Sequence, residues 1–529
     1  PRILSSILLD NAYLLVLAVG MTFVILTGGI DLSVGAVMAF TGILCASLLS
    51  QGIPVGVAVP AMILIGAAIG LLILHRTEPV VAHSVGGYIP GLAIPFVSDT
   101  FTALMLLLTS VTSLVSCIFL VSTGEDQYRF VPALILMMLT GVYGAILTGD
   151  LFNFFVFIEV MVLPAYALIA VTGTWRRLGV GRMFVMVNLL TSTLLLIGVG
   201  FVYGALGTVN LAVLASLGTP TGQGALALGI VLFALLVKAG GAPFHGWLAR
   251  SYPNTSAGMM SLFAGLHSKV ALYAIYRICT TVYGEPPAWA NAIIAIAVVS
   301  IIVGSLSGFG QNRVRNVLAF QMTSGVGHIL LGVALLTAQA LAAGAFYMVH
   351  HMITMAGLLL VMGAIEQTYG TGSFKKLSGL ASREKWAAVL MVLGLFSLIG
   401  LPPTSGMWGK IGLISAATAV EDAAGWWLVS AIVIGSLISM LALQNTWRNT
   451  FWGAPMQSYR PDSAETGRAA SVAITDDVRI PGRLLVPATI MIALSVAIFV
   501  WPEPLLEITG RAATGLLDHT EYIEAVIGR

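Results

Sequence analysis

GDLFNFFVFIEV, from Gly149 to Val160, places the carboxylate of Glu159 inside an apolar run that continues to Ala170. An unpaired ionised side chain in hydrocarbon is costly, so an acid at membrane depth is a functional hypothesis whose partner must be named. The candidate partners are lysines that lie in or beside similarly apolar segments: Lys238, Lys269 and Lys410. We therefore expect Glu159 to act together with one or more of these amines.

The composition indicates a membrane protein. Of the 529 residues, 58% are hydrophobic and only 9% are charged, and the mean hydropathy is +0.98. A soluble globular chain carries about 25% charged residues. A membrane-spanning helix needs about 20 apolar residues, which leaves room for about 14 or 15 transmembrane helices in this chain. The sequence predicts an all-α polytopic membrane protein, and the net charge of +2 gives no indication of nucleic-acid binding.

Apolar runs that are separated by Gly, Pro and charged residues mark the expected spans. They cover residues 11–28, 34–50, 54–74, 101–121, 131–148, 151–172, 183–205, 224–239, 257–280, 288–308, 314–336, 339–365, 386–420, 425–447 and 483–501. Loops rich in Lys and Arg accumulate on the cytoplasmic side of a membrane. On this basis the polar segment before the last span lies in the cytoplasm. We divide the chain into an N-terminal membrane segment (1–74), a transmembrane core (75–452), this cytoplasmic loop (453–482) and a last span with its tail (483–529).

Two of the expected spans contain similar interruptions. Residues 238–247 read KAGGAPFHGW, and residues 400–410 read GLPPTSGMWGK. Proline removes a backbone donor, and carbonyls freed at membrane depth persist only where protein or water satisfies them. Interrupted helices at corresponding positions of two halves indicate the ion path of a transporter. We therefore expect two discontinuous helices.

Lys238 is separated by only one residue from the first glycine of its break and follows an unbroken apolar approach. A desolvated lysine releases its proton more readily when a neighbouring carboxylate moves away, so a movable Glu159 would act as a switch. The alternatives are a static ion pair that joins two helices, and a lysine that extends to the membrane surface. The adjacent break favours transport, because a structural ion pair needs no opened backbone.

Histidines accompany these amines, and they titrate near neutral pH, which suits a proton relay. His267 lies two residues before Lys269, and a core histidine explains that spacing equally well. The remaining candidates are His245, His328, His350 and His351. His350 and His351 are adjacent and point about 100° apart on a helix, so we do not expect both to share one path directly. Asp150 precedes the span of Glu159, and we expect it to cap that helix.

Motifs for enzymatic chemistry are missing from the sequence. It has no phosphate-binding loop and no nucleophile with a base at motif spacing, and its cysteines, Cys45, Cys117 and Cys279, show no metal-ligand spacing. We therefore expect no cofactor, no metal site and no enzymatic activity. The energy for transport would come from an ion gradient or from a partner protein.

From about Leu72 onward, the chain resembles the D subunit of the Mrp-type multisubunit Na⁺/H⁺ antiporters, which is related to the antiporter-like subunits of respiratory complex I. The motifs that carry the resemblance are LTGDLFN (147–153) with Glu159, VKAGGAPFHGWL (237–248), SKVALY (268–273), and GLPPTSG (400–406) with Lys410. The resemblance implies two inverted five-helix repeats with broken helices, a location in the cell membrane, and partners that are other antiporter subunits. Protons and Na⁺ would be the transported ions.

The resemblance also implies a role for each matching residue. Glu159 and Lys238 would form the switch pair, Lys269 would belong to a central hydrophilic axis, and Lys410 would belong to the exit half-channel. Met355 departs from the pattern, because the family often has a lysine a few residues after the position of His351. The proton path between the halves would then differ here or rely on histidine.

Residues 11–13 read NAY and residues 20–35 read GMTFVILTGGIDLSVG. On this stretch, residues 1 to about 70 resemble instead a fragment of the permease of ribose-type sugar ABC transporters. The first residue is Pro1, so we expect the chain to begin inside a longer protein or to be processed. Two alternatives to an antiporter function stay open at this point. One is a proton-pumping subunit of a complex I-like NADH dehydrogenase or membrane hydrogenase, and the other is a component of a sugar permease.

Overall fold

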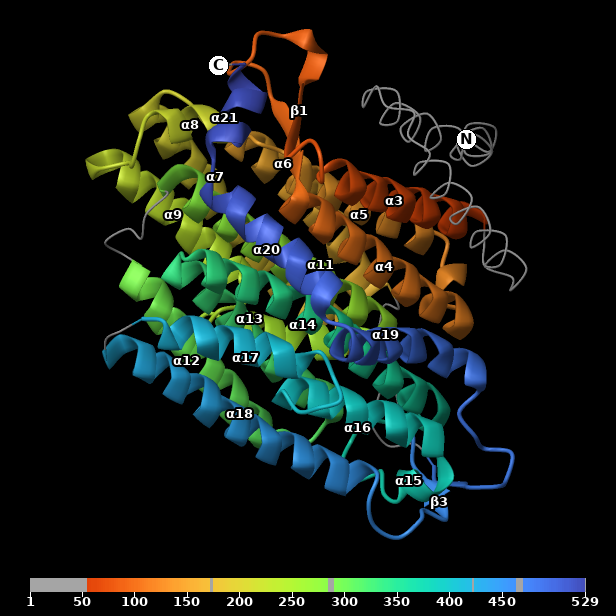
Figure 1. The fold of residues 1–529 in the computed structure, drawn as a ribbon. Helices are drawn as coiled ribbons and strands as arrows, with labels where there is room; N and C mark the ends of the chain where they lie inside the picture. Colours follow the sequence, from red (N-terminus) through yellow and green to blue (C-terminus); the bar gives the residue numbers. More distant parts are fainter. Residues whose placement is uncertain (1–54, 172–174, 284–289, 421–422, 463–469, 529) are drawn as a thin grey trace, which may run out of the picture.

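The protein is a bundle of long helices with two short hairpins (Figure 1). A computed structural model describes residues 55–171, 175–283, 290–420, 423–462 and 470–528. Within these ranges, nine helices are long and apolar enough to cross a membrane. The expected runs 11–28 and 34–50 lie outside the described residues. The prediction of an all-α multi-pass membrane protein is confirmed.

The helices of the first half begin with α3 and end with α11. They are α3 (Val55–Leu74), α4 (Thr100–Thr123), α5 (Val131–Leu147), α6 (Leu151–Ala170), α7 (Trp175–Leu206), α8 (Leu211–Ser216), α9 (Gly222–Ala239), α10 (Gly246–Ser251) and α11 (Ala257–Ile278). The antiparallel strands β1 (Val80–Ser84) and β2 (Pro95–Asp99) form a hairpin between α3 and α4. The short helix η3 (Tyr252–Asn254) joins α10 to α11.

The second half repeats the order of the first. Its helices are α12 (Ala290–Phe309), α13 (Val314–Leu335), α14 (Ala338–Tyr369), α15 (Leu380–Arg383), α16 (Lys385–Ile399), α17 (Gly406–Thr418), α18 (Ala423–Thr450) and α19 (Gly482–Val500). Strands β3 (Ser458–Tyr459) and β4 (Val472–Ala473) pair between α18 and α19. Two further helices, α20 (Glu503–Leu517) and α21 (Thr520–Ile527), follow the last span.

Both predicted interruptions are present as helix breaks. Helix α9 ends at Gly240 and α16 ends at Gly400, and these glycines have φ angles of 81° and 92°. Glycine adopts this left-handed conformation without the steric penalty that a Cβ would bring, so it terminates each helix. The chain resumes as α10 in the first half and as α17 in the second. In each half the broken helix is the fourth of five, as the expected repeats require. The first repeat consists of α5, α6, α7, α9/α10 and α11, and the second consists of α12, α13, α14, α16/α17 and α18.

The core lies where α11, α13 and α14 meet. All residues of α11 are buried, and α11 packs against α14, α9 and α4. A helix that is buried on every side occupies the centre of a large bundle. Polar side chains on α11 and α14 are therefore removed from lipid as well as from bulk water.

The C-terminal helices form a strap over the bundle. Helix α20 packs on α14 and α4, and α21 reaches α8 and strand β1, so the C-terminal end lies beside the first hairpin (Figure 1). Under this strap, Arg277 forms a buried ion pair of 2.7 Å with Asp99 and lies over the ring of Tyr522 at 5.2 Å. The residues after the last span were expected only as a tail, so these helices are an addition.

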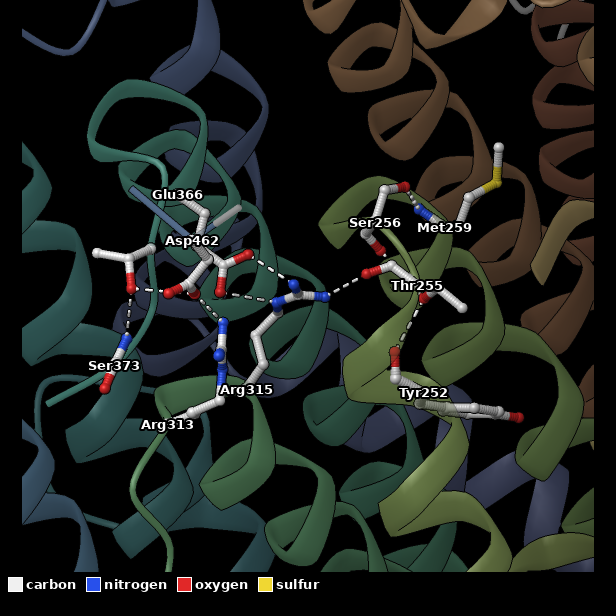
Figure 2. Close-up of polar contacts among 10 residues, drawn as sticks. Tyr252, Thr255, Ser256, Met259, Arg313, Arg315, Glu366, Ser373 and Asp462 are labelled. Atoms are coloured by element: carbon white, nitrogen blue, oxygen red, sulfur yellow. Dashed lines mark hydrogen bonds and ion pairs between the residues drawn. The ribbon is translucent and has the colours of Figure 1, made fainter. Parts of the chain in front are cut away.

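One end of the bundle is held by a network of arginines (Figure 2). Arg315 forms an ion pair of 2.6 Å with Glu366 at the end of α14 and donates to the Thr255 carbonyl before α11. Arg313 forms an ion pair of 2.6 Å with Asp462. The network therefore joins α13 and α14 to the first half and to the segment after α18.

Candidate functional site

The amine of Lys238 is buried at the break of the first discontinuous helix. Lys238 lies in the last turn of α9, is 2% exposed, and donates to Asn188 Oδ1 of α7 at 3.2 Å. The carbonyl of Val237 beside it accepts from the Gly240 amide at 3.2 Å and also from the Trp247 indole at 3.0 Å, across the break. The amine and the opened backbone are thus held separately, each by a neutral partner.

Glu159 lies near Lys238 but does not pair with it directly. It is half-buried in α6, and within the described ranges its Oε1 atom is buried without a hydrogen-bond partner. Its charge nevertheless acts on the Lys238 ammonium. The expected switch pair is therefore open in this conformation, and Asn188 takes the contact that the sequence assigned to Glu159. Asn188 was not singled out from the sequence, although it is a lone amide in the apolar run 183–205.

Lys269 lies at the centre of the bundle on α11. It is 1% exposed, and its ammonium donates to the Ala264 carbonyl at 2.9 Å and to Ser268 Oγ at 3.2 Å. His267 points to a different neighbour: its ring stacks on Phe263 at 4.8 Å, and its Nδ1 lies 3.4 Å from the Tyr252 hydroxyl. Two residues that are close in sequence therefore face different parts of the core.

Three further histidines meet between α13 and α14. His351 lies against Gly325, where a Cβ atom would overlap the imidazole Nε2. The His328 ring stacks on the Tyr347 ring with 4.8 Å between ring centroids, and the centroid of the Tyr347 ring lies 5.1 Å from that of His350. Glycine on α13 therefore allows the imidazole of α14 to come close, and the tyrosine lies between the other two rings.

Lys410 belongs to the second break. Its ammonium donates to the carbonyl of Ile399, the last residue of α16, at 2.9 Å, and to Ser436 Oγ of α18 at 2.6 Å. The carbonyl end of a helix carries partial negative charge, which favours a cation there. Lys410 thus satisfies the opened backbone at the second break, whereas the Trp247 indole does so at the first.

The buried lysines and histidines of the candidate site are together called the buried row. Its members are Lys238, His267, Lys269, His351, His350, His328 and Lys410. The charge of Lys238 acts on His267, that of Lys269 on His351, and that of Lys410 on His328 and His350. Ion pairs in the described ranges lie elsewhere, so no carboxylate neutralises these amines directly. The arrangement can hold and exchange protons across the middle of the bundle.

His245 is the one predicted histidine that lies apart from the buried row. It is half-buried in the first break, and its ring packs on Phe320 at 6.0 Å. Asp150 caps α6 as expected, because its carboxylate accepts from the Asn153 amide at 2.8 Å. In the described part of the chain, no group of three or more His, Cys, Asp or Glu residues is arranged to hold a metal ion.

Comparison with known proteins places this arrangement in a family. Residues 148–439 match the family described as NADH:quinone oxidoreductase/Mrp antiporter, TM. The chain is 31% identical over 481 residues to the D subunit of the Na(+)/H(+) antiporter of Alkalihalophilus pseudofirmus, a match that covers 89% of this chain and 93% of that protein. It is 30% identical over 457 residues to the protein of the same name from Bacillus subtilis, covering 85% and 89% respectively.

Solved structures agree with the sequence relatives. A chain of the Mrp complex from Dietzia sp. DQ12-45-1b superposes with a TM-score of 0.84 at 37% identity, covering 98% of this chain and 100% of that one. A chain of an archaeal membrane-bound sulfane sulfur reductase shares the fold, with a TM-score of 0.78 at 24% identity, covering 93% and 98% respectively. The resemblance of residues 1 to about 70 to a sugar permease falls mostly outside the described residues and stays a prediction. The chain belongs to the NADH:quinone oxidoreductase/Mrp antiporter family of membrane proteins, together with the antiporter D subunits.

Proposed function

We propose that this chain is the proton-translocating membrane subunit of a multisubunit antiporter that exchanges protons for a monovalent cation. The relatives are named for Na⁺ and H⁺, and one of the structures above is a chain of the Mrp complex. The observation that carries the proposal is the buried row, whose lysines and histidines are less than one-tenth exposed and have no directly paired carboxylate in the described ranges. Intramembrane amines of this kind mark ion pathways.

The proposed switch lies at Lys238. In the conformation described here its amine donates to Asn188, and Glu159 lies close enough for its charge to act on the amine. Movement of Glu159 toward Lys238 would favour the protonated amine, and movement away would favour proton release. Asn188 would hold the amine while the carboxylate is withdrawn.

The proposed path runs from Lys238 through His267 and Lys269 to the histidines of α13 and α14, and then to Lys410. The electrostatic influence of each lysine supports this order, because the charge of Lys238 acts on His267, that of Lys269 on His351 and that of Lys410 on His350. Buried imidazoles need hydrogen-bond partners, and water supplies them where protein does not. These histidines would thereby take over the role of the lysine that the family often has where this chain has Met355.

The test of the switch is the variant Glu159→Ala in the assembled complex. Cation-driven pH change is measured in inverted membrane vesicles, with the amount of assembled complex quantified in the same membranes. We expect the exchange rate to fall by about 10²-fold, the usual contribution of a positioned acid or base. Glu507→Ala serves as a control, because Glu507 is an exposed carboxylate on α20 whose ion partner is Arg511. Wild-type exchange in Glu159→Ala would refute the switch.

The complex I-like alternative shares the fold, and a chain of respiratory complex I from Thermus thermophilus superposes with a TM-score of 0.71 at 22% identity. This likeness supports the fold alone. The identity to the antiporter D subunits favours the antiporter, so we retain that function.

A further inference from the structure

Beside the buried row, a cluster of hydroxyl groups surrounds one face of His350. The Nδ1 atom of His350 lies 3.0 Å from Ser405 Oγ, 3.3 Å from Thr354 Oγ1 and 3.4 Å from Ser397 Oγ. Ser495 of α19 completes the cluster. All of these side chains are 0% exposed, and they come from α14, α16, the second break and α19. The mechanism proposed above does not use these hydroxyls.

The hydroxyls are connected to one another as well as to the imidazole. Ser405 Oγ lies 2.8 Å from Ser495 Oγ, and Ser397 Oγ lies 3.1 Å from the same atom. Thr354 Oγ1 lies 2.8 Å from Ser397 Oγ. Two parallel routes therefore lead from His350 to Ser495, one through Ser405 and one through Ser397.

The backbone is shaped to bring this cluster together. A Cβ atom on Gly406 would overlap the Ser397 carbonyl and would lie 2.9 Å from Cε1 of His350. The amide of Ser405 also donates to the Ser495 carbonyl at 3.1 Å. The start of α17 is thus fixed against α14, α16 and α19, which makes the cluster a consequence of the helix break.

The chemistry of the cluster suits protons better than metal cations. A hydroxyl both donates and accepts, so it can receive a proton on one side and release its own on the other. The cluster contains no carboxylate, and the charge of Lys410 acts on His350, so a buried metal cation would be neither neutralised nor shielded from repulsion. The Nε2 atom of His350 is buried without a hydrogen-bond partner in the described ranges, so one nitrogen of the ring is available to take up a proton.

We propose that Ser397, Ser405 and Ser495 form a branched proton relay from His350 to α19. In each transfer Nε2 of His350 takes up a proton from the buried row, and the resulting imidazolium donates the proton on Nδ1 to Ser405 Oγ or Ser397 Oγ. That serine passes its own proton to Ser495 Oγ, and Ser495 passes one to water on the α19 side. The charge and proton count of His350 and the serines are then as before, and a flip of the imidazole together with rotation of the hydroxyls restores the starting orientation. The inference rests on the proposed function, and it adds an exit branch that ends at α19.

The branched geometry makes a prediction that packing alone does not. Ser397→Ala and Ser405→Ala each leave one route intact, so each lowers the exchange rate of the assembled complex only slightly. The double variant and Ser495→Ala remove both routes, and we expect the exchange rate to fall by about 10²-fold, the lower end of the range for loss of a proton-transfer group. Parallel routes require the double variant to exceed the sum of the single variants, but serines that share His350 and Ser495 can also be non-additive through packing. The relay is therefore distinguished from packing by its dependence on an exchangeable proton at residue 495. Ser495→Cys keeps an exchangeable proton on a side chain of similar size, so this variant should recover part of the exchange rate.

The measurement is cation-driven pH change in vesicles, made in H₂O and in D₂O, with assembly checked by size-exclusion chromatography. Thr489→Ala, on the same helix but bonded to the Leu485 carbonyl and the Trp386 indole, is the matched control and should keep the wild-type rate. Wild-type exchange in Ser495→Ala, or additive effects of the two single variants, would overturn the relay. A changed cation half-saturation with unchanged pH dependence and isotope effect would also overturn it, by indicating a cation site. Loss in Glu159→Ala with none in Ser495→Ala would leave the proposed function standing without the relay.

Discussion

The carboxylate of Asp462 forms ion pairs with two basic side chains from separate parts of the chain. Lys376 Nζ lies 2.5 Å from Oδ1, Arg313 lies 2.6 Å from Oδ2, and the Thr371 hydroxyl donates to Oδ2 at 3.2 Å. Partial burial on its own would raise the pKa of Asp462, but the hydrogen bond from Lys376 and the charge of Arg313 outweigh it and lower the pKa below its usual range. A single residue thus ties the segment after α18 to α13.

This pairing sets a pH dependence. Because the folded-state pKa is lowered, the stabilisation is complete above the unfolded value of about 3.9 and is lost as the pH falls through the lower folded value. We expect the backbone amides around Asp462 to lose hydrogen-exchange protection, after correction for intrinsic rates, only below about pH 4. Asp462→Asn should show the loss at neutral pH as well. Equal protection of wild type and variant at neutral pH would contradict this account.

Residues near a helix end could be predicted better than residues that meet across the bundle. The Asp150 cap follows from a local pattern, and the structure has it. The Lys238 contact with Asn188 depends on which side of α7 faces α9, and no local pattern determines that. The serines around His350 lie in three separate elements, so their meeting could be found only from the fold.

Helix breaks are the elements on which the site depends. Both breaks were predicted, because glycine and proline interrupt apolar runs for local steric reasons. How the freed carbonyls are satisfied was not predictable, since Trp247 reaches back across one break and Lys410 across the other. Helices α20 and α21 were also missed, because their role as a strap over α4, α14 and β1 is a tertiary property.

At the same scale, the buried ion pair of Asp99 and Arg277 joins α4 to α11. We expect Asp99→Asn to lower the free energy of unfolding by about 3–5 kcal/mol, because it leaves Arg277 buried without its counter-charge. Asparagine still caps a helix, so the contact of residue 99 with the Thr102 amide is kept. The decrease in unfolding free energy therefore measures the loss of the ion pair with Arg277. The measurement is thermal unfolding of the purified complex in detergent.

The exposed pair of Glu507 and Arg511 on α20 provides the control for that measurement. Its atoms are 3.8 Å apart and Glu507 is largely exposed, so Glu507→Gln should change the unfolding free energy by less than about 1 kcal/mol. Equal effects of the two variants would contradict the role given to the buried pair.

For the whole molecule, the fold places amines and imidazoles from both halves into one row across the bundle. Lysines near the two breaks lie at its ends, and α11 and α14, the most buried helices, supply its middle. Two consecutive five-helix units with the fourth helix broken account for this placement, since each unit brings a break toward the shared centre. The strap and the arginine network then hold the two units together.

The central claim is that protonation of buried amines is reversible during transport. Lys238→Arg tests it most directly, because arginine keeps the positive charge and can still donate to Asn188 but does not release its proton at physiological pH. We predict a complex that assembles normally and shows no cation-driven pH change in vesicles, whereas Lys375→Arg, at an exposed position, keeps the wild-type rate. Exchange at the wild-type rate in Lys238→Arg would contradict the account.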